Sequence, residues 1–203
     1  MITIVDYGLG NILAFQNVYK RLNVECTIAR RADDLRGATR LILPGVGAFD
    51  HAMELLDASG MRAPVDELVL DKRVPVLGIC VGMQILARAS EEGSAPGLGW
   101  IAGGVRGFRS LGRDDLLLPH MGWNDVRPAR PSPLFAGLET DARFYFLHSF
   151  FFECERAEDV AATSAYGTDF ASAVHAGNIH GVQFHPEKSH HFGTQLLKNF
   201  AEL

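Results

Sequence analysis

The stretch VLGICVGMQ, residues 76–84, places a cysteine between two glycines where a short apolar run meets a helical pattern. Pro75 comes just before the run, at a strand start, where a missing N–H matters least. Glycines permit a sharp turn, and such a turn presents the side chain of Cys80 at the strand end. The N-terminus of the following helix would favour thiolate over thiol. The stretch therefore predicts a strand, a nucleophile elbow and a helix, with a buried structural cysteine as the alternative.

Short β-branched runs alternate with helical patterns on the N-terminal side of this stretch. Strands are predicted over 2–5, 24–28 and 41–43, and helices over 12–22, 48–56 and 62–71. Strand alternating with helix favours parallel pairing. The predicted fold class is therefore α/β, with an open, doubly wound, mostly parallel sheet of the flavodoxin-like kind.

The pattern changes from about residue 100 to strands separated by short turns. Two dipeptides, Gly103-Gly104 and Gly177-Asn178, lie between short apolar runs and predict tight hairpins. Residues 144–152 are apolar on both alternating faces, which is typical of one central strand. Because no repeat or linker interrupts the chain, residues 1–203 are expected to form a single domain in which antiparallel strands extend the parallel sheet.

The composition excludes several classes of protein. Of 203 residues, 47% are hydrophobic and 21% are charged, and the formal net charge is -5. A mildly acidic chain without a Lys/Arg run offers no footprint for nucleic acid or an anionic membrane, so neither is expected as a partner. The uncharged run at residues 74–87 is shorter than the roughly 20 residues of a membrane span. The cysteines, Cys26, Cys80 and Cys154, are too far apart in sequence to suggest a disulfide framework, which favours a reduced, cytoplasmic setting.

A second reactive pattern is QFHPEK, residues 183–188, which follows an apolar strand. In extended backbone, residues two apart face the same side, so Glu187 is placed to accept a hydrogen bond from the ring of His185. Pro186 biases His185 toward that geometry. A carboxylate there holds the imidazole in one tautomer while it takes a proton from Cys80, although such a pair alone is more often a surface ion pair. The neighbouring histidines lack metal-ligand spacing, and no metal site is expected.

Six segments together resemble the class I glutamine amidotransferases and, more narrowly, the glutaminase subunits of imidazole glycerol phosphate synthases. They span nearly the whole chain. The segments are LPGVGAFD (43–50), GICVGMQ (78–84), SEEG (90–93), PHMGWND (119–125), FLHSF (146–150) and GVQFHPEKS (181–189).

The resemblance implies a hydrolytic mechanism with a Cys-His-Glu triad. Cys80 would attack the side-chain amide carbon of L-glutamine, His185 would pass the proton to the leaving ammonia, and Glu187 would orient His185. Water would then hydrolyse the thioester to glutamate. The resemblance implies no cofactor.

It also implies roles for the surrounding residues. Backbone N–H groups of Val81, Val46 and Gly47 would form the oxyanion hole. The residues implied to contact glutamine are Gln84, Glu92, and the backbone of His148 and Ser149. The residues implied to face a synthase subunit near the ammonia exit are Pro119, Met121, Trp123 and Lys188.

The implied partner is the cyclase subunit, which would form a heterodimer with this chain and use the ammonia to make imidazole glycerol phosphate and AICAR in histidine biosynthesis. Ala14 stands where the family pattern often has a small polar residue. Segments 49–53 and 59–61 also resemble paralogues that supply ammonia for amidating surface-polysaccharide sugars. Two further alternatives are a free-standing cysteine hydrolase or peptidase and a catalytically silent interaction module; the intact Cys80, His185 and Glu187 argue against silence.

Overall fold

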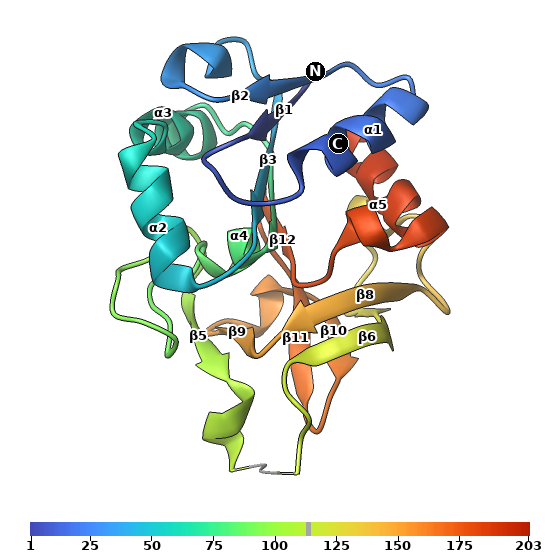
Figure 1. Ribbon diagram of the computed structural model, residues 1–203. Helices are drawn as coiled ribbons and strands as arrows, with labels where there is room; N and C mark the ends of the chain where they lie inside the picture. Colours follow the sequence, from blue (N-terminus) through green and yellow to red (C-terminus); the bar gives the residue numbers. More distant parts are fainter. Residues whose placement is uncertain (113–114) are drawn as a thin grey trace.

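The computed structural model describes residues 1–112 and 115–203, and a mixed sheet runs through its centre (Figure 1). Five of its strands pair in parallel in the order β2-β1-β3-β4-β12. These strands are β1 (Ile2–Val5), β2 (Cys26–Ala29), β3 (Arg40–Gly45), β4 (Val76–Cys80) and β12 (Ile179–Val182). β1 and β4 are buried along their whole length, which explains why their sequences are apolar rather than alternating.

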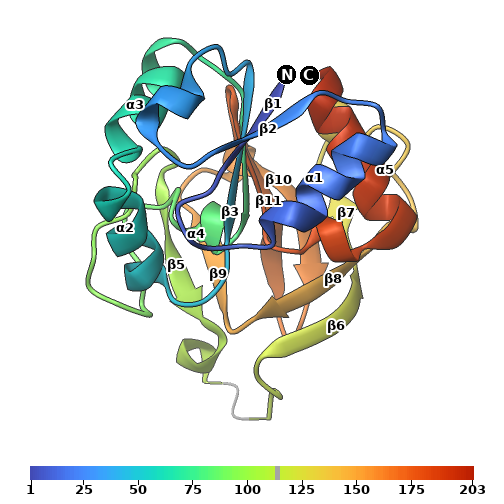
Figure 2. The same cartoon turned by 45° about the horizontal axis from the view of Figure 1, so that its top comes forward.

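Helices cover both faces of this parallel part (Figure 2). On one side, α1 (Ile12–Arg21) lies beside α5 (His190–Glu202). On the other side lie α2 (Phe49–Ala58) and α3 (Arg62–Asp66), which continues as a π-helical turn over Glu67–Asp71. The open, doubly wound arrangement predicted from the sequence is confirmed.

Antiparallel strands extend the sheet beyond β12. β11 (Asp169–Ala176), β10 (Val160–Ala165) and β7 (Arg127–Pro128) follow one another toward that edge. β11 and β12 form the hairpin predicted at Gly177-Asn178, where Gly177 has a φ of 63°. A second branch leaves β11 through β9 (Phe150–Cys154), which pairs with β5 (Gly103–Gly107).

The hairpin predicted at Gly103-Gly104 is wrong, because both glycines lie inside β5 and pair with Cys154 and Glu153 of β9. A Cβ on Gly103 would lie 2.4 Å from the carbonyl oxygen of Glu153. Glycine is needed here for a close approach of two backbones rather than for a turn.

The single central strand predicted over residues 144–152 is also wrong. The segment breaks at Ser149 into β8 (Arg143–His148) and β9, which belong to different sheets. β8 pairs with β6 (His120–Asp125) in a separate two-stranded sheet. The break turns the backbone around Ser149 toward the end of β4.

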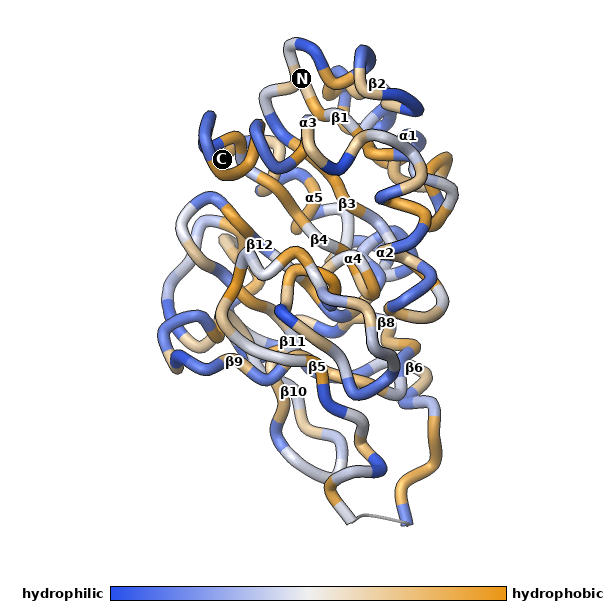
Figure 3. The backbone as a smooth tube through the Cα atoms, turned by 90° about the vertical axis from the view of Figure 1, so that its left-hand side faces the viewer, coloured by the Kyte–Doolittle hydropathy of each residue, from blue (hydrophilic) through white to orange (hydrophobic). Residues whose placement is uncertain are grey.

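Short helical segments complete the chain. They are α4 (Val81–Gln84) and 3₁₀ turns at Ala32–Leu35, Phe108–Leu111, Pro133–Phe135, Ala157–Asp159 and Pro186–Lys188. Figure 3 shows mainly apolar backbone along β1 and β3, inside the helical layers. Across residues 1–112 and 115–203, no helix has the length and apolar character needed to cross a membrane.

Candidate active site

Cys80 ends β4 with a left-handed backbone, φ 56° and ψ −114°. A non-glycine residue in such a conformation costs about 1 to 3 kcal/mol, so the surrounding structure must impose it. Two glycines make this possible. A Cβ on Gly78 would lie 2.5 Å from the carbonyl oxygen of Gly82, and a Cβ on Gly82 would lie 1.9 Å from that of Leu43. The sharp strand-to-helix turn that the sequence predicts is therefore present.

His185 and Glu187 follow β12, the strand that pairs in parallel with β4. His185 donates a hydrogen bond from Nδ1 to Glu187 Oε1 at 2.9 Å, and the two side chains are only 4% and 2% exposed. This bond leaves Nε2 of the ring for Cys80. Burial lowers the pKa of His185, but hydrogen bonds with Cys80 and Glu187, together with the charges of both groups, outweigh burial and raise it to about 10. The site therefore favours an imidazolium beside the sulfur.

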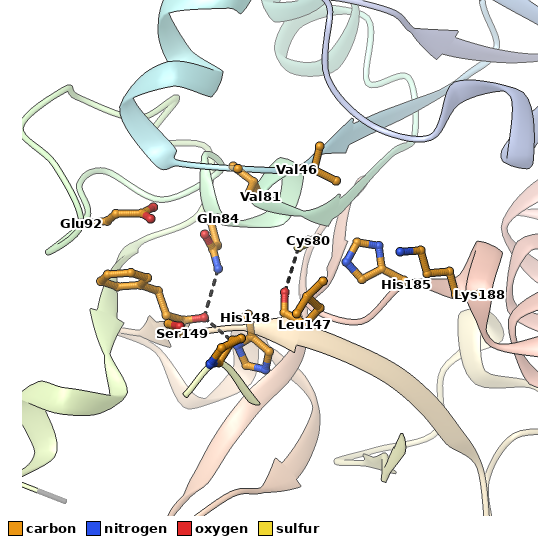
Figure 4. Close-up of a pocket in the computed structure, with 13 residues that line it drawn as sticks. Val46, Cys80, Val81, Gln84, Glu92, Leu147, His148, Ser149, His185 and Lys188 are labelled. Atoms are coloured by element: carbon orange, nitrogen blue, oxygen red, sulfur yellow. Dashed lines mark hydrogen bonds between the residues drawn. The ribbon is translucent and has the colours of Figure 1, made fainter. Parts of the chain in front are cut away.

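The side chain of Cys80 opens into a cavity of about 260 Å³ (Figure 4). Its walls bring together segments from both halves of the chain. The lining residues are Val46, Gly47, Cys80, Val81, Gln84, Glu92, Pro119, Leu147, His148, Ser149, Phe150, His185 and Lys188. Sequence reasoning named all of these except Leu147 and Phe150. Glu187 stands behind His185, and Met121 and Trp123 lie outside the cavity.

The loop that follows β3 forms one wall. The Tyr7 hydroxyl donates a 2.7 Å hydrogen bond to the carbonyl oxygen of Pro44. A Cβ on Gly45 would lie 2.6 Å from the backbone nitrogen of Gly82, so the loop lies directly against the start of α4. Val46 is half exposed, and Gly47 has a φ of 97° with open space around it. The loop is thus held at Pro44 and Gly45 and exposed at the next two residues.

Gln84 and Glu92 lie at the far end of the cavity from His185 (Figure 4). Glu92 Oε2 accepts a 2.8 Å hydrogen bond from the backbone N–H of Phe49, at the start of α2. Gln84 donates from Nε2 to the Phe150 carbonyl oxygen and to Gln183 Oε1, both at 3.0 Å. These partners hold both side chains in one orientation.

Sequence reasoning assigned no role to Gln183, although it quoted the motif that contains this residue. Gln183 is fully buried, and its Nε2 donates to Cys80 Sγ at 3.8 Å. Its position directly after a buried strand was the available signal. A buried amide at a strand end needs polar partners, and the elbow is the nearest polar site.

Met121 and Trp123 project from the outer face of β6. They are 65% and 41% exposed, whereas His120 on the opposite face is buried. Met121 is paired in register with Leu147, which lines the cavity, and Trp123 is paired with Tyr145. An exposed apolar surface, defined by Met121, Trp123 and Leu147, therefore adjoins the cavity mouth, and it is called the β6–β8 face below.

The other two cysteines differ chemically from Cys80. Burial raises the pKa of Cys26 to about 11 and that of Cys154 to about 12, so both remain thiols at neutral pH. Neither residue lines the cavity. Among the residues whose placement is described, no group of three or more His, Cys, Asp or Glu side chains is arranged to hold a metal ion.

Comparisons with known proteins identify the family of the chain. Residues 3–203 match the family described as Glutamine amidotransferase class-I. The chain is 62% identical to a protein of Bdellovibrio bacteriovorus named imidazole glycerol phosphate synthase subunit HisH, with 100% of both chains covered. It is 51% identical to a protein of the same name from Leptospira borgpetersenii, again over 100% of both chains.

The fold is shared more widely. A solved structure described as a glutamine amidotransferase aligns with a TM-score of 0.75 at 21% identity, covering 99% of this chain and 97% of its own. A putative GMP synthase protein from Thermoplasma acidophilum aligns with a TM-score of 0.73 at 23% identity, covering 99% and 92%. The chain belongs to the class I glutamine amidotransferases and, within them, to the group of imidazole glycerol phosphate synthase subunits named HisH.

Proposed function

We propose that this chain is a glutaminase subunit that hydrolyses L-glutamine and passes the ammonia to a cyclase subunit of imidazole glycerol phosphate synthase in histidine biosynthesis. The observation that carries the proposal is one cavity that the strained Cys80 shares with His185 of the buried His-Glu pair. The side chains of Gln84 and Glu92 and the segment His148-Ser149 line the same cavity. A free amino acid fits the size of this cavity, which is small for a peptide.

The first half of the reaction uses the pair Cys80 and His185. His185 takes the thiol proton at Nε2, and the thiolate attacks the side-chain amide carbon of glutamine. The tetrahedral intermediate collapses when His185 returns the proton to the leaving nitrogen, so that ammonia departs and a thioester remains. Glu187 holds the ring in the tautomer that this transfer requires and stabilises the imidazolium.

In the second half, His185 accepts a proton from water, and the hydroxide adds to the thioester carbon. Collapse of this intermediate releases glutamate and returns the proton to Cys80. Both intermediates carry an oxyanion, for which the N–H of Val81 and a peptide N–H at Val46 or Gly47 are the proposed donors. The open backbone at Gly47 allows that peptide to change orientation.

The remaining wall residues select the substrate. Glu92 is proposed to meet the ammonium group of glutamine, and Gln84 a polar N–H group of the substrate. The backbone of His148 and Ser149, at the break between β8 and β9, is proposed to bind the substrate carboxylate.

The β6–β8 face is the proposed docking surface for the synthase subunit, with Pro119 and Lys188 at the ammonia exit. Exposed apolar patches of this kind mark interaction sites, and an aromatic side chain at the centre is a typical anchor. Because Met121 and Leu147 are cross-strand neighbours, a partner bound there lies directly over the cavity mouth.

The test is a glutaminase assay of the pure chain alone, with the histidine-pathway cyclase subunit, and with a sugar-amidating synthase from the same source. If docking completes the oxyanion hole, the correct partner raises the rate of glutamate formation about 10² to 10³-fold. Trp123→Ala should weaken this stimulation without unfolding the chain, whereas the exposed Leu70→Ala, on the π-helical turn after α3, is the matched control.

Stimulation by the cyclase supports the proposal. Stimulation by the sugar-amidating synthase alone would assign the chain to surface-sugar amidation instead. If the pure chain is fully active alone and neither partner stimulates it, the chain is a free-standing hydrolase and the subunit proposal is overturned.

A further inference from the structure

Two buried histidines lie side by side behind the proposed glutamine site. His120 on β6 and His148 on β8 are register partners, and His120 Nδ1 is 2.9 Å from His148 Nε2. Both side chains are nearly inaccessible to solvent. His120 is also stacked between the rings of Tyr166 and Phe146, with centroids 4.1 Å and 4.9 Å away. A polar pair in such a place needs a defined arrangement of hydrogen atoms.

One end of the pair fixes that arrangement. Asn124 Nδ2 donates to the Ala165 carbonyl oxygen at 2.9 Å, and Asn124 Oδ1 accepts from the N–H of Asp125 at 2.8 Å, so the orientation of this amide is determined. Its second Nδ2 hydrogen points to His120 Nε2 at 3.2 Å. His120 Nε2 is therefore an acceptor, and the ring carries its proton on Nδ1.

At the other end of the pair, the tautomer of His148 is fixed by an independent contact. His148 Nδ1 lies 2.7 Å from the Phe150 carbonyl oxygen, which only accepts, so His148 also carries its proton on Nδ1. Its Nε2 is then free to accept from His120. Burial lowers the pKa of His148 to about 3 and that of His120 to about 4, so both rings stay neutral at neutral pH. The hydrogen bonds run in one direction, from Asn124 through both histidines to Phe150.

The Phe150 carbonyl is also the acceptor for Gln84 Nε2. Since the second Nε2 hydrogen of Gln84 goes to Gln183 Oε1, both amide hydrogens are occupied. Gln84 Oε1 is left to accept a hydrogen bond from an N–H group in the cavity. The position of the Phe150 carbonyl thus decides how the Gln84 amide is oriented toward the substrate.

We propose that His120 is a positioning residue for glutamine binding, which acts through His148 to hold the Phe150 carbonyl that orients the Gln84 amide. This inference rests on the proposed glutaminase function. The strand that carries His120 inward also carries Met121 and Trp123 outward, so one strand joins the β6–β8 face to the substrate site.

Steady-state kinetics of the full chain with its activating partner test the role of His120. His120→Phe keeps an aromatic ring between Tyr166 and Phe146 but removes the hydrogen bond to His148. The KM for glutamine should rise about 10-fold while kcat changes about 2-fold or less, because a binding group is displaced and the reacting atoms are not. His120→Asn, which can restore a donor near the place of Nδ1, should recover most of the lost affinity.

Phe170→Leu is the control for packing, because Phe170 contacts both rings and lies 3% exposed in the same cluster. It should lower stability without raising KM. The proposal is overturned if His120→Phe leaves KM unchanged, if Phe170→Leu raises KM equally, or if His120→Asn gives no recovery. A wild-type chain without glutaminase activity with any partner would instead refute the proposed function on which this inference rests.

A second measurement does not depend on how the variants fold. Nitrogen NMR of the histidine-labelled wild-type chain at neutral pH reports which ring nitrogen carries the proton. We expect His120 and His148 both to be protonated on Nδ1 and unprotonated on Nε2. A proton on Nε2 of either ring would break the directed chain and contradict the proposal.

Discussion

The parallel half of the molecule, residues 1–84, and the antiparallel half, from residue 103 onward, contribute different parts of the site. The parallel half holds Cys80 on a backbone that is packed too tightly for any residue but glycine at 78 and 82. The antiparallel half supplies side chains fixed by hydrogen bonds: His185, Glu187 and the wall around Phe150. One half thus fixes the nucleophile by steric packing, and the other fixes its partners by polar networks.

β12 joins the two arrangements. It pairs in parallel with β4, Val182 beside Ile79, and in antiparallel fashion with β11. Both β4 and β12 end at the same edge of the sheet, so Cys80 and His185 emerge together although 105 positions separate them in the sequence. The triad therefore depends on the one strand that belongs to both halves.

The largest expected effect comes from removing the nucleophile of the parallel half. Cys80→Ser should reduce glutaminase turnover about 10⁴-fold or more, because a hydroxyl is much harder to ionise than a thiol, while affinity for glutamine stays within a few-fold. Glutamate formation and calorimetric titration with glutamine measure the two quantities. Turnover close to that of the wild type would remove Cys80 from the mechanism.

A smaller loss is expected from the orienting group of the antiparallel half. Glu187→Gln should lower kcat about 10³-fold, because the ring loses its carboxylate partner but keeps a side chain of similar shape. His185→Ala, measured beside it, should lose more, since it removes the base itself. Equal losses in the two variants would mean that Glu187 acts on the reacting atoms directly.

Two glycines sharpen the contrast in packing. Gly82→Ala should lower the free energy of unfolding by about 3 kcal/mol, because its Cβ would meet the Leu43 carbonyl oxygen at 1.9 Å. Gly104→Ala in β5 is the matched substitution in the antiparallel half, where the nearest atom lies 3.8 Å away, and it should change stability by less than about 1 kcal/mol. Denaturant titrations compare the two. Similar losses would show that the elbow is no tighter than β5.

The antiparallel half should also carry most of the histidine-linked pH dependence of stability, since only His51 of the eight histidines precedes residue 103. Burial lowers the pKa of His120 and His148 to about 4 and 3, below the unfolded value of 6.5. The unfolded chain therefore binds more protons as the pH falls below about 6.5, and stability decreases, by about 1.4 kcal/mol per pH unit for each group at most. His185, with its pKa raised to about 10, has the opposite sign: its contribution is complete below the unfolded value of 6.5 and is lost progressively as the pH rises from there through about 10.

His120→Phe isolates one of these groups. Between pH 6.5 and 5, its unfolding free energy should fall less steeply than that of the wild type. The two slopes should differ by the contribution of one group, at most about 1.4 kcal/mol per pH unit. The titratable groups around His120 remain in the variant: His148 beside it, Tyr166 stacked on it, and His185, which acts on His148. Identical slopes would show that His120 is not held neutral.

Sequence reasoning was most successful where structure is local. The β-branched run at 2–5, the elbow around Cys80 and the hairpin at Gly177-Asn178 depend on neighbouring residues, and each was predicted. The break at Ser149 was not. Residues on both sides of it are apolar on both faces, so periodicity contains no signal for the change of sheet.

The same distinction applies to the site. Motif resemblance named nearly every residue that lines the cavity, because those residues lie in short recognisable segments. It did not find the contact between Gln183 and Cys80 or the pair of His120 and His148. These contacts depend on the register of strands that are far apart in the sequence, which only the folded chain specifies.

We propose that both halves assemble one glutamine site around a single reactive cysteine. A diazo-ketone analogue of L-glutamine, incubated with the chain and its activating partner and followed by peptide mass spectrometry, tests it most directly. We expect one adduct per chain, on Cys80, that excess glutamine prevents and that Cys80→Ser abolishes. An adduct on Cys26 or Cys154, or no adduct in the active complex, would contradict it.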